Sequence, residues 1–360
     1  MSNNATKNLI LHLSLIPGVG PVTISKIIRI SPVATNIYSW TEKEFIQEGL
    51  PLQTATLIVQ GLKNIQILDQ ELDAIERYRI SWVTLNEPDY PQLLKNIYCP
   101  PPVLYYRGQA LSSYSPALAF VGSRKATYYC QETVELVLPP LIEQGFCIVS
   151  GGALGADSIA HRQTIKLQGK TVAIIGSGLL KPYPASNRYL FNEIVDQGGA
   201  LVSPFPLFMQ AMAGNFPARN RIISGLSRAC IVLQAAAQSG ALITARYALE
   251  QGREVCAVPG PITEPLSYGC HKLLGQGATL VTSANDILMA LGYEIKQQAP
   301  KSTLSIAVHD PILQALEQPI SVDELANHTG QTILELQERL FELQLNGSVT
   351  QNFMGLWHIT

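Results

Sequence analysis

From residue 118 onward, short apolar runs alternate with longer segments in which apolar residues recur every three or four positions. Each run is followed by small or polar residues before the next periodic segment begins. This alternation is typical of strands and helices in βαβ units, which form a parallel sheet through right-handed crossovers. The pattern predicts strands at 118–121, 147–150, 171–175, 200–203, 230–234, 254–258 and 279–281, and helices at 127–143, 156–167, 187–197, 220–226, 240–251, 268–276 and 284–291.

The N-terminal region lacks this alternation and shows helical patterns alone. Two apolar-periodic stretches are joined by "PGVG" at 17–20, and a further helical pair is expected at 54–60 and 64–78. The glycine-rich hairpin resembles a helix-hairpin-helix element, whose backbone amides can meet a DNA phosphate. A tight turn that only joins two packed helices explains the same residues, because few basic side chains surround it.

The C-terminal region has a third pattern. Residues 294–307 lose their periodicity and are expected to form a linker. Helical patterns follow at 309–317, 321–329 and 332–346, and the last stretch alternates like a short hairpin. Three helices and a hairpin are the winged-helix pattern, a variant of the helix-turn-helix.

The chain of 360 residues is long enough for more than one hydrophobic core. The expected fold is α/β, with an extended Rossmann-like, doubly wound and mostly parallel sheet. The expected domains are a small all-α domain (helix-hairpin-helix/SAM-like) at 1–80, the Rossmann-like domain at 81–293, a linker at 294–307 and a winged-helix-like domain at 308–360.

Charge is sparse and unevenly distributed. Lys and Arg number 25 and Asp and Glu 27, and only 14% of residues are charged, as in an ordinary globular protein. Residues 100–291 carry fourteen basic and ten acidic groups, whereas 308–360 carry one basic and seven acidic. A polyanion would therefore bind the middle of the chain. Glutamates outnumber Arg339 in the expected recognition helix, so we expect the winged-helix-like domain to contact protein or nothing, but not DNA.

Cysteine spacing and hydropathy favour a cytoplasmic protein that is not inserted in a membrane. The six cysteines show no CxxC spacing, and most lie in apolar runs, as buried reduced thiols do. No apolar stretch approaches the roughly 18 residues that span a bilayer. The N-terminus lacks a basic segment followed by an apolar core, so no signal peptide is expected. No metal site is expected either.

The strand at 147–150 ends in the glycine-rich turn "SGGALGADSIAH". Gly151, Gly152 and Gly155 would let the backbone approach an anion and point free amides at it. The spacing differs from GxGxxG and no acidic residue ends the next strand, so neither a nicotinamide nor a flavin cofactor is expected. Asp157 and His161 share one helix face, as an acid/base pair or as structural groups that orient the turn.

Other polar residues follow the remaining strands. In an open α/β sheet, ligands bind at the carboxyl ends of the strands. Phe216 lies outside any helix or strand pattern and could stack on an unpaired base. Arginines near it suit phosphates, or alternatively pair with acidic residues of neighbouring helices. Besides the three glycines, the residues expected to bind DNA are Arg124, Lys181, Phe216, Arg219, Asn220, Arg221, Ser239 and Gly240. Ser239 and Gly240 are equally explained as an ordinary helix cap.

Six motifs occur in a fixed order over about 170 residues, and together they resemble the DNA-processing protein A (DprA/Smf) family. They are "GSR" at 122–124, "SGGALGADSIAH" at 150–161, "GSGLLKPYPASN" at 176–187, "NFPARNRIISGLS" at 215–227, "SGALITARYA" at 239–248 and "GREVCAVPG" at 252–260.

This resemblance implies a non-catalytic protein that binds single-stranded DNA in its Rossmann-like domain and forms a homodimer through that domain. It also implies loading of RecA recombinase onto strands coated by single-strand-binding protein, in natural transformation. Arg124 falls where the family places an arginine on DNA phosphates, and Phe216 begins the family's FPxRN signature. The sequence departs from the family's pattern at Ala185, Gln234 and His271, and in the reading "SGGALGAD".

Two other functions remain open. An enzyme could act on a nucleotide or a nucleotide-derived molecule through the same phosphate-binding edge, with Asp157 and His161 as its acid and base. A purely structural recombination scaffold would bind no strand at all. Turnover of free nucleotides would distinguish the enzyme from a DNA-binding protein. Binding of a single strand by the middle domain would distinguish the DNA-binding protein from the scaffold.

Overall fold

The computed structural model describes residues 2–30, 34–293, 311–316, 318–345, 349–352 and 355–359. The chain divides into two compact units, Met1–Ile295 and Lys296–Thr360. The linker expected at 294–307 lies outside the described residues. The first unit contains both the N-terminal helices and the sheet.

Within the described residues, nine strands form the large sheet in the order β1-β2-β6-β5-β4-β3-β7-β8-β9. β3 to β9 run parallel, while β1 and β2 pair antiparallel at one side. The chain adds strands on one side of β3 and then on the other, so the predicted doubly wound sheet is confirmed. The strands are β1 Ser81–Thr84, β2 Val103–Gly108, β3 Ala117–Val121, β4 Cys147–Ser150, β5 Thr171–Ile174, β6 Ala200–Ser203, β7 Ala229–Val232, β8 Glu254–Ala257 and β9 Thr279–Leu280.

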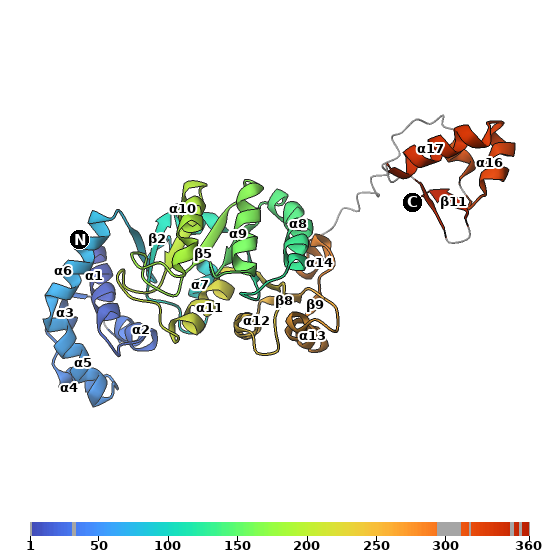
Figure 1. Ribbon diagram of the computed structural model, residues 1–360. Helices are drawn as coiled ribbons and strands as arrows, with labels where there is room; N and C mark the ends of the chain where they lie inside the picture. Colours follow the sequence, from blue (N-terminus) through green and yellow to red (C-terminus); the bar gives the residue numbers. More distant parts are fainter. Residues whose placement is uncertain are drawn as a thin grey trace. The chain divides into compact units, whose positions relative to one another are not determined.

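Helices cover both faces of this sheet, as Figure 1 shows. α8, α9 and α10 lie on one face, and α11, α12 and α13 lie on the other. The central strands are therefore buried on both sides, which explains their continuous apolar runs. The helices are α8 Tyr128–Glu143, α9 Ala156–Lys166, α10 Arg188–Asp196, α11 Asn215–Leu226, α12 Gly240–Glu250, α13 Tyr268–Gly275 and α14 Ala284–Ala290, with the short α7 at Gln92–Lys95.

The N-terminal helices share a hydrophobic core with the β2, β5 and β6 side of the sheet. At this contact, the Glu71 carboxylate of α6 accepts a hydrogen bond of 2.8 Å from the Leu207 amide, in the loop after β6. The expected hairpin at 17–20 is present as a turn in which Gly18 has a φ of 84°. The helices are α1 Ser2–Leu15, α2 Pro21–Ile30, α3 Ala34–Ile37, α4 Glu42–Gln47, α5 Leu52–Lys63 and α6 Ile65–Arg77.

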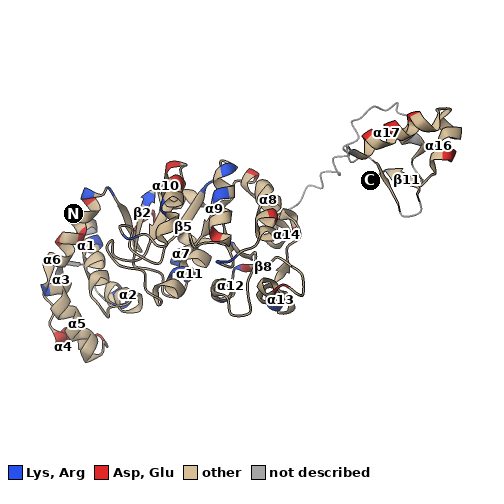
Figure 2. Ribbon diagram, viewed as in Figure 1, with Lys and Arg blue, Asp and Glu red and all other residues tan. Residues whose placement is uncertain are grey.

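The C-terminal unit is a small winged-helix domain with its own core. The capping box of Ser321 and Glu324 begins α16, and Gly330, with a φ of 70°, ends it. Acidic side chains lie along α16 and α17, shown in red in Figure 2. Its elements are α15 Pro311–Ala315, α16 Val322–Thr329, α17 Ile333–Leu345, β10 Val349–Gln351 and β11 Trp357–Ile359.

One difference from the predicted elements matters for the site. The sequence pattern predicts a helix over 220–226 and an irregular segment before it, but α11 begins at Asn215. Pro217 is the reason for the difference. A proline in the first helical turn is tolerated, because the amide that it lacks has no partner within the helix there. Phe216, Arg219, Asn220 and Arg221 therefore all lie on a helix.

Candidate nucleic-acid interface

Two arginines and two aromatic rings meet at the carboxyl edge of the sheet. The Arg124 guanidinium carbon lies 5.3 Å from the centroid of the Phe216 ring, and that of Arg219 lies 5.9 Å from it. Both distances are within the range of cation–π attraction. The Tyr183 ring lies beside Phe216, with 5.9 Å between the ring centroids. We call Arg124, Tyr183, Phe216 and Arg219 the aromatic–arginine cluster.

This cluster adjoins a groove of about 500 Å³ that passes the loop after β5. Tyr183 and Phe216 line both the cluster's pocket and the groove, so the two are continuous. Lys181 and Arg188 also line the groove, and both are exposed. Lys181 is among the predicted residues, whereas Tyr183 and Arg188 were not predicted. Both could have been found from their position in the sequence. Tyr183 lies in the polar loop that follows the buried strand β5, and Arg188 comes directly after that loop.

The glycine turn after β4 does not offer all of its amides to a ligand. The Asp157 carboxylate accepts hydrogen bonds from the Gly151 amide at 3.1 Å and the Ala153 amide at 3.2 Å. The Ala156 amide donates to the Ser123 carbonyl at 3.0 Å. The expectation that this turn presents free amides is therefore wrong for these three. Asp157 orients the turn, as the structural interpretation of this residue predicts.

The three glycines instead allow close packing around the cluster. A Cβ on Gly151 would lie 1.6 Å from a guanidinium nitrogen of Arg219, and one on Gly152 would lie 2.5 Å from the Phe191 ring. A Cβ on Gly155 would lie 2.4 Å from the Ser123 carbonyl oxygen. Gly155 also has a φ of 75°, which side-chain-bearing residues rarely adopt. This glycine thus lets the turn after β4 pack against the turn that carries Arg124.

Arg219 is buried, with only 5% of its surface exposed. Its guanidinium donates a hydrogen bond of 2.9 Å to the Ile174 carbonyl, at the end of β5. Burial lowers the pKa of Arg219 to about 10, and the Asp157 carboxylate opposes that shift. Burial likewise raises the pKa of Asp157, with the Arg219 charge opposing. Arg219 therefore supports the Phe216 ring from within the protein, and Arg124 is the exposed cation of the cluster.

Arg221 does not lie with the cluster. Two helical positions separate it from Arg219, a rotation of about 200° around the helix axis. Its backbone carbonyl accepts a hydrogen bond from Gln251, and its charge lies near the buried Tyr90. Arg219 and Arg221, both expected to bind DNA, therefore point to different sides, because both lie on α11 rather than in an irregular segment. Asn220 contacts the start of α12, where its amide donates to the Gly240 carbonyl at 3.4 Å.

The remaining predicted residues hold loops together. The Ser239 hydroxyl caps α12 by accepting a hydrogen bond of 3.3 Å from the Ala241 amide. Gln234, two residues after the end of β7, makes two side-chain hydrogen bonds of 2.9 Å to Thr127. Its carbonyl accepts a further hydrogen bond of 2.7 Å from the Ser123 amide. Gln234 thus fixes both ends of the turn that carries Arg124.

His161 is buried, and its hydrogen bond is to a threonine rather than to Asp157. Its Nδ1 lies 2.7 Å from the Thr171 hydroxyl, which itself donates to the Ile148 carbonyl. The hydroxyl proton is thus used, so Nδ1 carries the hydrogen of this bond. Burial, reinforced by the Arg219 charge, lowers the pKa of His161 to about 3. This histidine is a structural group at neutral pH.

Comparison with known proteins shows which family this chain belongs to. A sequence model of the family described as DNA recombination-mediator protein A matches residues 81–292, and a model of the DprA winged helix domain matches 296–352. The chain belongs to the DNA recombination-mediator protein A family. The family match covers all the strands of the large sheet and every residue of the aromatic–arginine cluster.

Individual members of the DprA/Smf family align over much of the chain. Protein Smf of Escherichia coli is 36% identical over 326 residues, which cover 86% of this chain and 87% of that protein. The DNA processing protein DprA of Bacillus subtilis is 40% identical over 225 residues, which cover 62% of this chain and 75% of that protein. Most of each relative's length is therefore represented here.

Solved structures of the family agree with this fold. The crystal structure of DNA processing protein A from Streptococcus pneumoniae, 32% identical, superposes with a TM-score of 0.67 and covers 78% of this chain and 97% of that one. A structure of DNA processing protein A from Helicobacter pylori, described as giving insights into its single-stranded DNA binding mode, is 30% identical with a TM-score of 0.52. It covers 59% of this chain and 98% of that one.

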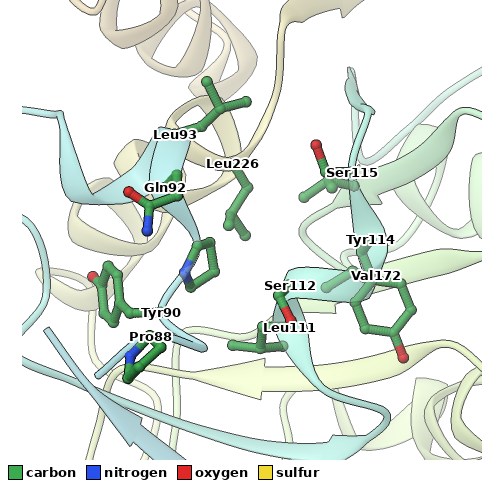
Figure 3. Close-up of a pocket in the computed structure, with 12 residues that line it drawn as sticks. Pro88, Tyr90, Gln92, Leu93, Leu111, Ser112, Tyr114, Ser115, Val172 and Leu226 are labelled. Atoms are coloured by element: carbon green, nitrogen blue, oxygen red, sulfur yellow. The ribbon is translucent and has the colours of Figure 1, made fainter. Parts of the chain in front are cut away.

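A second cavity of this DprA-family chain, of about 180 Å³, lies away from the cluster. Figure 3 shows residues of the Pro88–Leu93 segment facing residues of the 111–115 segment across it. Leu226, the last residue of α11, also lines it, whereas Phe216 lies at the opposite end of that helix. Its lining is mainly apolar and contains no charged side chain, so it offers nothing for a phosphate.

Among the described residues, no helix is long and apolar enough to cross a membrane.

Proposed function

We propose that this chain binds single-stranded DNA along the groove that ends at the aromatic–arginine cluster. The observation that carries the proposal is the Phe216 ring, which lies beside Tyr183 with the exposed Arg124 guanidinium 5.3 Å from its centroid. Aromatic rings stack on unpaired bases of any sequence, and a neighbouring guanidinium suits the phosphates between them. The Helicobacter pylori relative, which binds single-stranded DNA, supports this assignment.

Each group has a distinct role in the proposed complex. Phe216 and Tyr183 contact bases, and the exposed cations Arg124, Lys181 and Arg188 contact phosphates. Arg219 holds Phe216 in place from below. The glycine turn packs against the loop that carries Arg124, so it positions that loop more than it binds DNA through its own amides. Few cations and no broad basic face favour a single strand over a duplex.

The proposal predicts a measurable salt dependence. Neutralising three phosphates of a single strand gives a slope of about −2 for the logarithm of affinity against the logarithm of salt concentration. Fluorescence anisotropy of a labelled oligothymidylate across a salt series measures this slope. Arg124→Ala should weaken binding and reduce the slope by about 0.7. Arg246→Ala, which removes an exposed arginine paired with Glu250 on α12, is the matched control and should bind as the wild type does.

Either of two results would count against this proposal. One is that duplex DNA binds at least as tightly as a single strand of the same length at the same salt concentration, and the other is that Arg124→Ala binds as tightly as the Arg246→Ala control. In both cases the cluster does not hold an unpaired strand. Binding by the wild-type chain that disappears only in Arg124→Ala supports the proposal.

We further propose that the bound strand is passed to RecA recombinase in the cytoplasm, during DNA uptake by natural transformation and recombination. Membership of the recombination-mediator family supports this step. A homodimer formed through the Rossmann-like domain is part of the proposal. The test is RecA-dependent strand exchange on DNA coated with single-strand-binding protein, with dimer formation followed by sedimentation. Exchange that is no faster with this protein than without it would count against the loading role.

The enzymatic alternative has little support in the geometry. Its two candidate groups are both committed within the fold, Asp157 to the amides of the glycine turn and His161 to Thr171. A neutral imidazole with a pKa of about 3 is a poor base at physiological pH. We therefore propose a binding protein without catalytic residues. Incubation with free nucleotides should leave them intact, and turnover that is lost in Asp157→Asn would reverse this assignment.

A further inference from the structure

A second set of exposed aromatic side chains lies at the same edge of the sheet as the cluster, beyond β3, β7 and β8. Tyr128 begins α8, directly after the loop that carries Arg124 and Lys125, and 68% of its surface is exposed. Tyr268 begins α13, directly after the loop that follows β8, and is 46% exposed. Both helices start where parallel strands end, so both rings lie at the carboxyl edge.

Contacts between these loops hold the two helix starts together. Tyr129 donates a hydrogen bond of 2.7 Å from its hydroxyl to the Pro259 carbonyl, in the loop after β8. A Cβ on Gly260 would lie 3.9 Å from the Tyr129 ring and 2.2 Å from the Ser267 hydroxyl. Tyr129, which follows Tyr128, and Ser267, which precedes Tyr268, therefore both lie close to Gly260. The first turns of α8 and α13, which carry Tyr128 and Tyr268, are therefore both held against the loop after β8.

Charge at this patch suits a nucleic acid. Arg124, which belongs to the cluster, and Lys125 are both exposed, and they follow β3, which lies between β5 and β8 in the sheet order. Glu264, the acidic residue of the loop after β8, accepts a hydrogen bond of 3.1 Å from the Leu266 amide, which orients its carboxylate but leaves its negative charge in place. Exposed tyrosines beside exposed cations are the combination that single-strand-binding surfaces use.

We propose that Tyr128 and Tyr268 form a second base-stacking platform, which the same DNA strand reaches after crossing Arg124 and Lys125. This inference rests on the proposed function. From β5, beside Tyr183, to β8 is four strand spacings in the sheet order, or about 19 Å. At about 3.4 Å per stacked nucleotide, roughly six nucleotides cover that distance. Short oligonucleotides then occupy only the groove, and longer ones gain the second platform.

The test is anisotropy of the full chain with oligothymidylates of about 4 and about 12 nucleotides, chosen to fall short of and to exceed this span. The variant is Tyr128→Ala/Tyr268→Ala, and the control is Tyr128→Phe/Tyr268→Phe, which keeps both rings. Tyr129, which holds the loops, is left unchanged. We expect the alanine variant to lose at least about fivefold in affinity for the long strand, and to bind the short strand as the wild type does. The phenylalanine variant should bind both strands nearly as tightly as the wild type.

Three other outcomes overturn the inference, and they are distinguishable. If the alanine variant binds both lengths like the wild type, the patch contacts no DNA. If it loses affinity for both lengths and sediments as a smaller species, the tyrosines form a contact between two copies of the chain. If the wild type binds neither length, the proposed function itself fails. In that last case Phe216→Ala changes nothing, whereas in the first case Phe216→Ala still weakens binding.

Discussion

Gly155→Ala tests whether the glycine turn works by packing rather than by offering amides. The added Cβ would lie 2.4 Å from the Ser123 carbonyl oxygen and 2.6 Å from two backbone atoms of Arg124. Backbone cannot move aside as a flexible side chain can, so the turn that carries Arg124 must shift. The φ of 75° adds strain of its own. Overpacking costs about 1–3 kcal/mol and an unfavourable backbone region about 1–3 kcal/mol, or about 2–6 kcal/mol together.

Urea unfolding monitored by circular dichroism measures this loss of stability, and anisotropy with a single strand measures its effect on binding. We expect a lower unfolding free energy and, in protein that is still folded, weaker binding than the wild type. The matched control is Gly275→Ala at the end of α13, where a Cβ meets nothing within 4 Å. That change should stabilise by about 0.5–1 kcal/mol and leave binding unchanged. A cost below about 1 kcal/mol for Gly155→Ala, with normal binding, would refute the packing argument.

Three further predictions concern individual side chains. His161 has a pKa of about 3 in the folded state and 6.5 when unfolded, so its neutral form contributes stability above about pH 6.5 that is lost as the pH falls. At pH 5 the loss in unfolding free energy is about 2 kcal/mol. Urea unfolding of His161→Asn at the same pH values should not show this loss. Burial raises the pKa of Glu71, so the stability that its protonated form contributes is lost as the pH rises through the folded-state pKa. Glu71→Gln should therefore show a smaller fall in unfolding free energy with rising pH than the wild type. Parallel pH profiles of unfolding free energy for the two proteins would contradict this. Arg221→Met should leave single-strand affinity within about twofold of the wild type, whereas Arg124→Met should lower it by roughly tenfold; equal losses in anisotropy would show that Arg221 contacts DNA after all.

The central strands could be predicted from the sequence because they are buried on both faces. Such strands need continuous apolar runs, and the predicted limits of β3 to β9 agree with the structure to within two residues. β1 and β2 were not predicted. They pair antiparallel at the side of the sheet, and their sequences, SWVT and VLYYRG, mix apolar and polar residues, with only the short α7 between them.

The composition of the site was predictable, but its geometry was not. Arg124 and Phe216 follow from position at strand ends and from residue type, and they do meet in the structure. The direction of each arginine on α11 depends on where that helix begins, and Pro217 concealed its first turn. Neither the burial of Arg219 nor the amides taken by Asp157 has a local signal, because both depend on contacts between loops far apart in the sequence.

The hydrogen bond between Glu71 and Leu207 makes the limits of the family's shared domain differ from the limits of the folded unit. The family match starts at residue 81, yet a chain cut there would leave the Leu207 amide without its carboxylate acceptor and expose apolar surface around Tyr105 and Phe191. The loop that contains Leu207 also pairs with Leu180 beside the groove. In evolutionary terms, the N-terminal helices are not an interchangeable attachment. A lineage that loses them leaves the Leu207 amide and the apolar surface around Tyr105 and Phe191 without their partners.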